Sequence, residues 1–404
     1  TTGDNNTAVG IFAMGVNTTG QYNTAVGGNS LDANTSGTNN TAVGRLSLSA
    51  NTTANNNTAV GVSALQPNTT GSENQAFGTF ALTSNTTGYS NTSVGYNTLG
   101  AVTTGFQNTA TGFRTGQAIT TGAGHTAIGF SALKAATTID YGFALGYEAG
   151  ANNTSGTNNT YVGSFCGDSV TTGGDNTYVG FQAGAGTTTG GANVAIGKTA
   201  FDVNTTGSNN VAIGQNALGA STGGGDLVAV GTAAGDTLTG GGNSVIIGSL
   251  ADASGANISN EIVIGFNSTG KGANTGFINP NNGGVYQGNN STTWSQVSDI
   301  RIKKNITDNS DGLNKINNIQ VRNFEYRTKD EIKELPPECA IQKEGVQLGV
   351  IAQEVQDILP EIVKEETTGC LKIDPDNLTW YLVNAVQELS AKVKELETKL
   401  NEDK

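Results

Sequence analysis

Residues 23–27, with the sequence NTAVG, decide the fold because the same motif returns at every seventeenth position with small variations. The motif ends on a landmark glycine at Gly10, Gly27, Gly44, Gly61, Gly78 and Gly95, and it continues in the same phase as far as Gly265. A disordered segment rich in Gly, Asn and Thr has no reason to keep phase, whereas each coil of a solenoid must stack on the previous coil. The spacing therefore predicts a mainly β fold, with a β-solenoid of 17-residue coils over residues 1–265.

The positions within one repeat have separate physical roles. The residue before the landmark glycine is apolar in every copy except Thr111, and the residue before that is usually Ala. A Leu or Met lies four places after the glycine in six of the first seven copies, and a second glycine, such as Gly20 or Gly37, lies ten places after it. Glycine tolerates positive φ at tight corners. We therefore expect two glycine corners and two or three short strands per coil, with the Val and Leu positions holding the coils together.

Polar positions also repeat with the coil. Asn opens the motif in most copies, as at Asn6, Asn23, Asn40, Asn57 and Asn74. Stacked coils would align these side chains into a ladder in which amides bond to one another along the stack. His125 occupies the same position and is interpreted as a turn residue rather than a ligand. Tyr161 and Tyr178 replace the small Ala, which favours a packing role over cofactor binding.

The repeat offers few apolar side chains for a solenoid that stands alone, so we expect several chains to associate. Its motif resembles the head repeats of trimeric autotransporter adhesins, which imply a left-handed β-roll that forms trimers, and also the shaft repeats of phage and viral fibres. At about 4.8 Å per stacked strand, sixteen coils would span roughly 75 Å. Gly3 lies in the second-corner position of a preceding coil. We therefore expect the shaft to continue upstream towards a virion-attachment segment.

The chain changes character at residue 298. Residues 1–297 contain 17 charged residues and 54 glycines, whereas residues 298–404 contain 36 charged residues and 4 glycines, and the two parts carry net charges of −7 and −6. Neither part is basic, which argues against binding to nucleic acid, and no apolar run is long enough for membrane insertion. The chain has one histidine, twelve acidic residues in its first part and three scattered cysteines. This composition argues against a metal site, a cofactor and a disulfide framework.

The charged part has its own pattern. Residues 266–297 are expected to form a β-rich neck, and residues 298–404 a small α/β domain that ends in a helix. We expect a strand at 324–327 and a helix over 349–363 that is closed by Pro360. In the helix predicted over about 378–401, apolar residues alternate at spacings of four and three, which is typical of a coiled coil. This coiled-coil core consists of Leu382, Val386, Leu389, Val393, Leu396 and Leu400. An amphipathic helix that packs on its own domain is the alternative.

Four blocks of the charged part resemble the C-terminal intramolecular chaperone domain of phage endosialidases and tail fibres. They are residues 298–306 (SDIRIKKNI), 349–355 (GVIAQEV), 359–363 (LPEIV) and 378–397. The resemblance implies a trimer whose chaperone guides folding of the β-structure ahead of it and is then removed by autoproteolysis. It assigns Ser298 as the nucleophile, Lys303 as the base and Val297–Ser298 as the scissile bond. Such a lysine must be neutral, through burial or through cations such as Arg301.

These observations predict a homotrimeric fibre or spike of a virion, most simply a phage tail fibre, that acts on no external substrate. Variable residues such as Arg45, Phe80, Tyr96 and Phe113 are expected to face outward, where they could contact a host receptor or glycan. Three alternatives remain. The chain could serve chiefly as an autoprotease, it could be a cellular surface adhesin with the same chaperone, or it could be a Thr-rich ice-binding solenoid.

Overall fold

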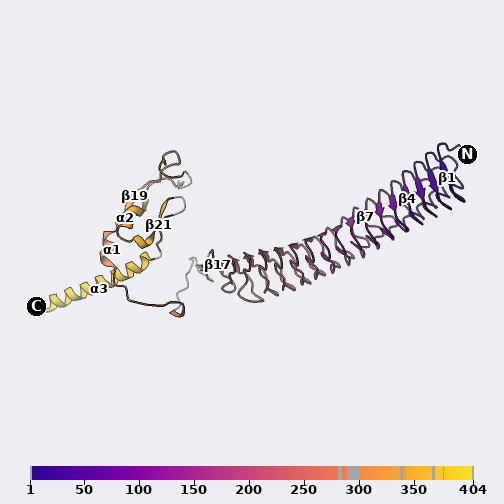
Figure 1. Ribbon diagram of the computed structural model, residues 1–404. Coiled ribbons are helices and arrows are strands. Elements are labelled where there is room, and N and C mark those ends of the chain that lie inside the picture. The colour runs from indigo at the N-terminus through magenta and orange to yellow at the C-terminus, as the bar shows by residue number, and fades with distance from the viewer. Residues whose placement is uncertain are drawn as a thin grey trace. The chain divides into compact units, whose positions relative to one another are not determined.

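The computed structural model describes residues 2–280, 284–288, 300–336, 341, 343–365, 369–375 and 377–402. The chain divides into two compact units, Thr1–Val297 and Ser298–Lys404. The boundary between them in the sequence is the point where the composition changes. Figure 1 shows the first unit as a stack of coils and the second as a group of short helices and strands followed by a long helix.

The first unit is a parallel β-solenoid with one three-residue strand in each coil, where two or three strands were expected. Neighbouring strands pair in register one full repeat apart, as where Ala25 lies opposite Ala42. The strands of the sixteen coils are β1 (Thr7–Val9), β2 (Thr24–Val26), β3 (Thr41–Val43), β4 (Thr58–Val60), β5 (Gln75–Phe77), β6 (Thr92–Val94), β7 (Thr109–Thr111), β8 (Thr126–Ile128), β9 (Phe143–Leu145), β10 (Thr160–Val162), β11 (Thr177–Val179), β12 (Val194–Ile196), β13 (Val211–Ile213), β14 (Val228–Val230), β15 (Val245–Ile247) and β16 (Ile262–Ile264).

The remaining sides of each coil are not strands because their backbone repeatedly enters the left-handed region. Phe12 and Met14, two and four places after the first landmark glycine, have φ of 56° and 51°, and the equivalent positions of later coils behave alike. Their amides still bond from coil to coil, as where the N–H of Met14 donates to the carbonyl of Ser30 at 3.0 Å. The stack is therefore hydrogen bonded on several sides although only one side has β geometry.

The interior of the coil is filled by the Ala and Leu positions, not by the Val position. From β2 to β16 the middle residue of every strand is buried, while the first and third residues are not. Leu31 and Leu48 are fully buried beside this Ala column. Successive side chains of a strand point to opposite faces. Because Ala points inward, Val must point outward, and the expectation that Val holds the coil together is wrong.

The two glycine corners are required for different reasons. The landmark glycines have φ between 130° and 143°, where an L side chain is strained. The second-corner glycines Gly20 and Gly37 do not have positive φ. A Cβ at Gly20 would instead meet the carbonyl oxygen of Gly37 in the next coil. Close approach of two backbones, rather than backbone conformation, therefore selects glycine at the second corner.

The predicted asparagine ladder is present and buried. The backbone N–H of Asn40 donates to Oδ1 of Asn23 at 2.9 Å, and its Nδ2 donates to the carbonyl of Ala54 at 2.8 Å. A second ladder, which the sequence analysis missed, runs seven places after the landmark glycines, where Nδ2 of Asn51 donates to Oδ1 of Asn34 at 2.9 Å. The amides of the two ladders thus bond within their coils and to neighbouring coils, with Oδ1 of Asn85 as an exception, and these bonds stabilise the stack.

His125 takes its place in the first ladder without disturbing it. Its Nδ1 accepts a hydrogen bond from the N–H of Gly142 at 3.0 Å, so the proton lies on Nε2, which donates to the carbonyl of Ile139 at 2.7 Å. Burial lowers the pKa of His125. The residue therefore acts as a neutral replacement for Asn.

The two buried tyrosines fill space that leucine leaves in the neighbouring coils. Four places after the landmark glycine, coils 9, 10 and 11 carry Gly150, Gly167 and Gly184 in place of Leu. A Cβ at Gly184 would collide with the ring of Tyr178, and one at Gly150 with the ring of Tyr161. These tyrosines therefore pack inside the coil, as the sequence analysis expected.

The regular stack ends after β16. Strand β17 (Gly276–Ile278) pairs parallel to β16 after a shortened coil, with Gly276 opposite Ile262, and β18 (Val285–Gln287) pairs antiparallel to β17. Buried Glu261 occupies the asparagine position of the last coil and accepts hydrogen bonds from the backbone N–H of Ser254 and of Gly272.

The second unit is built of short elements and one long helix. They are η1 (Ile300–Ile302), α1 (Leu313–Asn318), β19 (Arg322–Phe324), β20 (Gln347–Gly349), α2 (Ala352–Gln356), η3 (Pro360–Ile362), β21 (Val363–Glu365), β22 (Leu371–Ile373) and α3 (Leu378–Glu402). Strands β19 and β20 form one antiparallel pair, and β21 and β22 form another.

Two predictions for this unit need correction. The helix expected over 349–363 is only α2, which ends at Gln356, and Pro360 begins the 3-10 helix η3 rather than closing a helix. The non-helical backbone of Leu359 (φ −136°, ψ 71°) separates the two turns, so that Val355, Leu359 and Ile362 converge on one small core. The strand expected at 324–327 begins earlier, at Arg322, and ends at Phe324.

Candidate functional site

The proposed cleavage site lies at the start of the second unit. Val297 and Ser298 are outside the described residues, as is Asp299. Lys303 follows η1, and its backbone N–H donates to the carbonyl of Ile300 at 3.1 Å. The side chains of Lys303 and Arg301 are exposed. Burial within the single chain therefore does not supply the environment that a neutral lysine needs.

The first turns of α3 anchor it to α1 and the loop before it. Nδ2 of Asn384 donates to the carbonyls of Asn309 and Asp311 at 2.9 and 3.0 Å. The N–H of Leu313, at the start of α1, donates to Oε1 of Glu388 at 3.1 Å. A Cβ at Gly312 would meet the backbone of Ala385. The glycine thus permits close contact between the loop and the helix.

A second anchor joins α3 to η3. The hydroxyl of Tyr381 donates to the carboxylate of Glu361, which lowers the pKa of Glu361 and raises the pKa of Tyr381 to about 12. Nζ of Lys315 lies 5.2 Å from the centroid of the Tyr381 ring and 3.9 Å from Glu361. These contacts hold the first turns of the helix against the domain.

The rest of α3 leaves its apolar seam uncovered. Ala385 is the buried residue of this helix. The six residues of the predicted coiled-coil core are 46–65% exposed. Lys392 and Glu397 are exposed at the flanking positions, where they can pair between neighbouring helices. The helix is thus present and its seam is unpartnered in the single chain.

The second unit has little core of its own among its described residues. Val355, Leu359 and Ile362 form its buried apolar cluster, which is small for a unit that runs from Ser298 to Lys404. Cys370 is disulfide-bonded, a bond that the spacing of the cysteines did not predict. Cys166 is free and buried in the shaft, and burial raises the pKa of its thiol to about 12.

The shaft carries apolar side chains on its outer surface. We call the third residues of β1–β16 the strand-end row and the first residues the strand-start row. None of the sixteen strand-end residues, from Val9 to Ile264, is buried, and Ile128 and Leu145 are each 40% exposed. The row is apolar except at Thr111, and an apolar row of this length on a single chain is a mark of an interaction surface.

An aromatic ladder runs beside this row, one or two residues after the landmark glycines of coils 5 to 11. The rings of Tyr96, Phe113, Phe130 and Tyr147 stack with centroids 4.9–5.3 Å apart and planes within 12°. The full ladder is Phe80, Tyr96, Phe113, Phe130, Tyr147, Phe165 and Phe181. The sequence analysis placed three of these residues on the surface but missed the continuity of the ladder, which the 17-residue phase of the aromatics would have shown.

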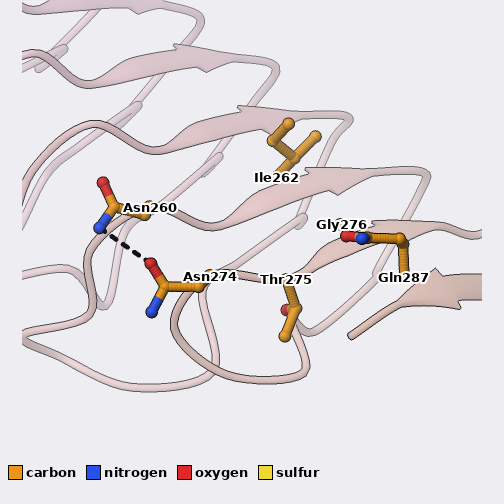
Figure 2. A pocket seen from close by; sticks show the side chains of 6 residues that line it. All are labelled: Asn260, Ile262, Asn274, Thr275, Gly276 and Gln287. Carbon is orange, nitrogen blue, oxygen red and sulfur yellow. Dashed lines mark hydrogen bonds between the residues drawn. The ribbon is translucent and has the colours of Figure 1, made fainter. Parts of the chain in front are cut away.

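A shallow pocket of about 350 Å³ lies at the end of the stack (Figure 2). Asn260 and Asn274 line one side, where their amides share a hydrogen bond of 3.2 Å, and Ile262, Thr275, Gly276 and Gln287 complete the lining. Among the described residues, no group of three or more His, Cys, Asp or Glu side chains could hold a metal ion. In the same part of the chain, no helix has the length and apolar character needed to cross a bilayer.

Comparison with known proteins adds two findings. Residues 298–364 match the family described as chaperone of endosialidase. The long tail fiber protein Gp37 of Enterobacteria phage K3 is 36% identical over 110 residues, which is 26% of this chain and 8% of that protein, and Gp37 of phage T2 is 36% identical over 7% of its length. No solved structure gives a significant match. The chain thus carries a chaperone-of-endosialidase domain at its C-terminal end, behind a β-solenoid shaft.

Proposed function

We propose that the chain belongs to a phage tail fibre that assembles as a homotrimer under the guidance of its C-terminal domain. The observation that carries this proposal is a chaperone-of-endosialidase match that directly follows a shaft with an unpartnered apolar row. In the virion, the shaft would present its outer surface to a host receptor or glycan.

Two separate surfaces support the trimer. The strand-end row runs the length of the shaft, and the seam of α3 runs along the last turns of the second unit. Parallel association of identical chains would bring both surfaces together in register. The heptad seam covers about three heptads, which is short for an isolated coiled coil, but the shaft adds a much longer contact. The helix would align the three chains before the coils stack.

We further propose that the chaperone domain is released by cleavage of the Val297–Ser298 bond. Oγ of Ser298 would attack the carbonyl carbon of Val297, and neutral Lys303 would accept the hydroxyl proton and pass it to the amine of Ser298 as the peptide bond breaks, which leaves an ester between the two residues. Water would then hydrolyse this ester, giving a carboxylate on Val297 and a free Ser298 hydroxyl, so that the domain separates from the shaft. Since Lys303 is exposed in the single chain, burial against a neighbouring copy would supply the environment that favours the neutral amine. Cleavage would then wait for trimerisation.

Mass in solution and denaturing electrophoresis test these steps separately. Light scattering should give three times the mass of the chain seen on the denaturing gel, and a monomer would contradict the proposal. On a denaturing gel, the 41.0 kDa chain should be replaced by a product that lacks everything from Ser298 onward. Ser298→Ala and Lys303→Ala should each retain the full-length band, whereas the matched controls Ser310→Ala and Lys304→Ala should be cut normally. Normal cutting of Lys303→Ala would rule out the dyad.

A further inference from the structure

The apolar surface of the shaft changes position between coils 11 and 12. The strand-start row is Thr in nine of the first eleven coils, with Gln75 and Phe143 as the exceptions, and is aliphatic in all of the last five, from Val194 to Ile262. The aromatic ladder runs through coils 5–11 and ends at Phe181, after which Lys198 takes the equivalent position. The strand-end row continues through both parts. A second apolar row therefore lies on one side of it in coils 5–11 and on the other side from coil 12.

We propose that neighbouring copies of this chain contact the strand-end row together with the aromatic ladder in coils 5–11, and together with the strand-start row in coils 12–16. The seam between chains would then shift by one row of side chains between Phe181 and Val194, and the copies would turn relative to one another at that level. This inference rests on the proposed trimer.

The surface area of the ladder fits this partner. Six of its seven rings are exposed, by 38–44%. At about 200 Å² per ring, they leave roughly 500 Å² of apolar surface, as much as the largest patch on a typical monomer. A landmark glycine alone separates the ladder from the strand-end row in five of the seven coils, and one further residue intervenes before Phe80 and Phe165. Together the two rows approach the roughly 800 Å² per partner that a stable interface buries.

The geometry of the rings favours a protein partner over a sugar. A pyranose binds an aromatic residue by laying its C–H face on the face of the ring. From Tyr96 to Tyr147 the ring faces are already stacked on one another, so that mainly ring edges remain available outside. Edges in a continuous row suit apolar side chains of a second copy, because edge-to-face contact with aromatic or aliphatic groups is favourable.

Tyrosine nitration in the assembled, full-length protein tests the upper part of this seam. Tyr96 and Tyr147 in the ladder are 43% and 44% exposed in the single chain. Tyr89 is a matched control because it is 45% exposed and stacks on Phe106 with a centroid distance of 4.9 Å, but lies near the second corner. Mass spectrometry after tetranitromethane treatment should show Tyr96 and Tyr147 nitrated several-fold more slowly than Tyr89. Equal rates in a protein of trimeric mass would overturn this inference and leave the trimer intact, whereas a monomer would overturn both.

Valine-to-threonine changes test the lower part. Val211→Thr with Val228→Thr places in coils 13 and 14 the residue that coils 1–4 carry at the same position, so the single coil should tolerate it. The double variant should lower the temperature at which the oligomer dissociates in detergent. Val203→Thr is the control, since Val203 is 41% exposed but lies outside both rows. An unchanged dissociation temperature in the double variant, with circular dichroism unchanged, would overturn the assignment of the strand-start row.

Discussion

Replacement of Tyr178 by alanine tests how the shaft compensates for missing leucines. Tyr178 is fully buried, and its hydroxyl donates to Oγ1 of Thr187 at 3.1 Å. Its ring lies over Gly167 and Gly184, which have no side chains to fill the space that it would leave. Truncation of a large buried aromatic costs about 3–5 kcal/mol. Tyr178→Ala should therefore weaken coils 10 and 11 by about that amount.

The structure also predicts which second change repairs this damage. Gly184 has φ of 63°, close to the φ of 49° and 52° at Leu133 and Leu218, which occupy the same position in other coils. Gly184→Leu alone should destabilise the shaft by about 1–3 kcal/mol because its side chain and the ring cannot share one space. In Tyr178→Ala/Gly184→Leu the leucine fills the cavity, so most of the lost stability should return.

Native-state hydrogen exchange is the suitable measurement, because a long solenoid does not unfold in a single step. The amide of Gly180 bonds to the carbonyl of Val162 at 2.7 Å and reports on opening of coil 11. In Tyr178→Ala it should exchange about 10²- to 10⁴-fold faster, at about 1.4 kcal/mol per factor of ten. The double variant should exchange far more slowly than Tyr178→Ala. A neutral Gly184→Leu, or a double variant as fast as Tyr178→Ala, would refute the packing argument.

Three further predictions concern the ladder, the seam and the corners. Burial lowers the pKa of His125, so coil 8 should lose stability as pH falls below about 6.5, where the unfolded chain binds a proton that the buried ring does not. His125→Asn should remove this pH dependence. Hydrogen-exchange rates that vary with pH equally in both proteins would refute the prediction. The double variant Leu389→Ser/Leu396→Ser should lower the oligomeric mass seen by light scattering, whereas Lys394→Ser should not. Equal masses for the two variants would argue against the coiled coil. Gly61→Ala should lower the stability of the shaft by about 1–3 kcal/mol, because φ is 139° and the added Cβ would lie 2.5 Å from the carbonyl oxygen of Gly78. Gly28→Ala is the control, since the nearest neighbour of its Cβ would lie 3.9 Å away. Thermal denaturation should show no change in stability for this control.

Much of the site could be predicted where a residue's role is local or repeats with the coil. The asparagine ladder followed from Asn6, Asn23 and their successors, because stacking at a fixed period places equivalent residues next to each other. The C-terminal helix followed from the spacing of Leu382, Leu389 and Leu396. The cleavage residues came from resemblance alone, and Ser298 lies outside the described residues, so the dyad stays a prediction.

The sequence by itself determined that the first part is a β-stack with a fixed period, that this glycine-rich, weakly charged part ends at residue 297, and that a charged unit with a terminal helix follows. It did so because a 17-residue period survives only if every coil repeats the same contacts. Only the tertiary structure decided which way each row points. The one-residue alternation of a strand turns Ala inward and Val outward, and the left-handed residues on the other sides of the coil limit each coil to one strand. That choice of faces put the apolar rows on the surface, where a partner chain can reach them.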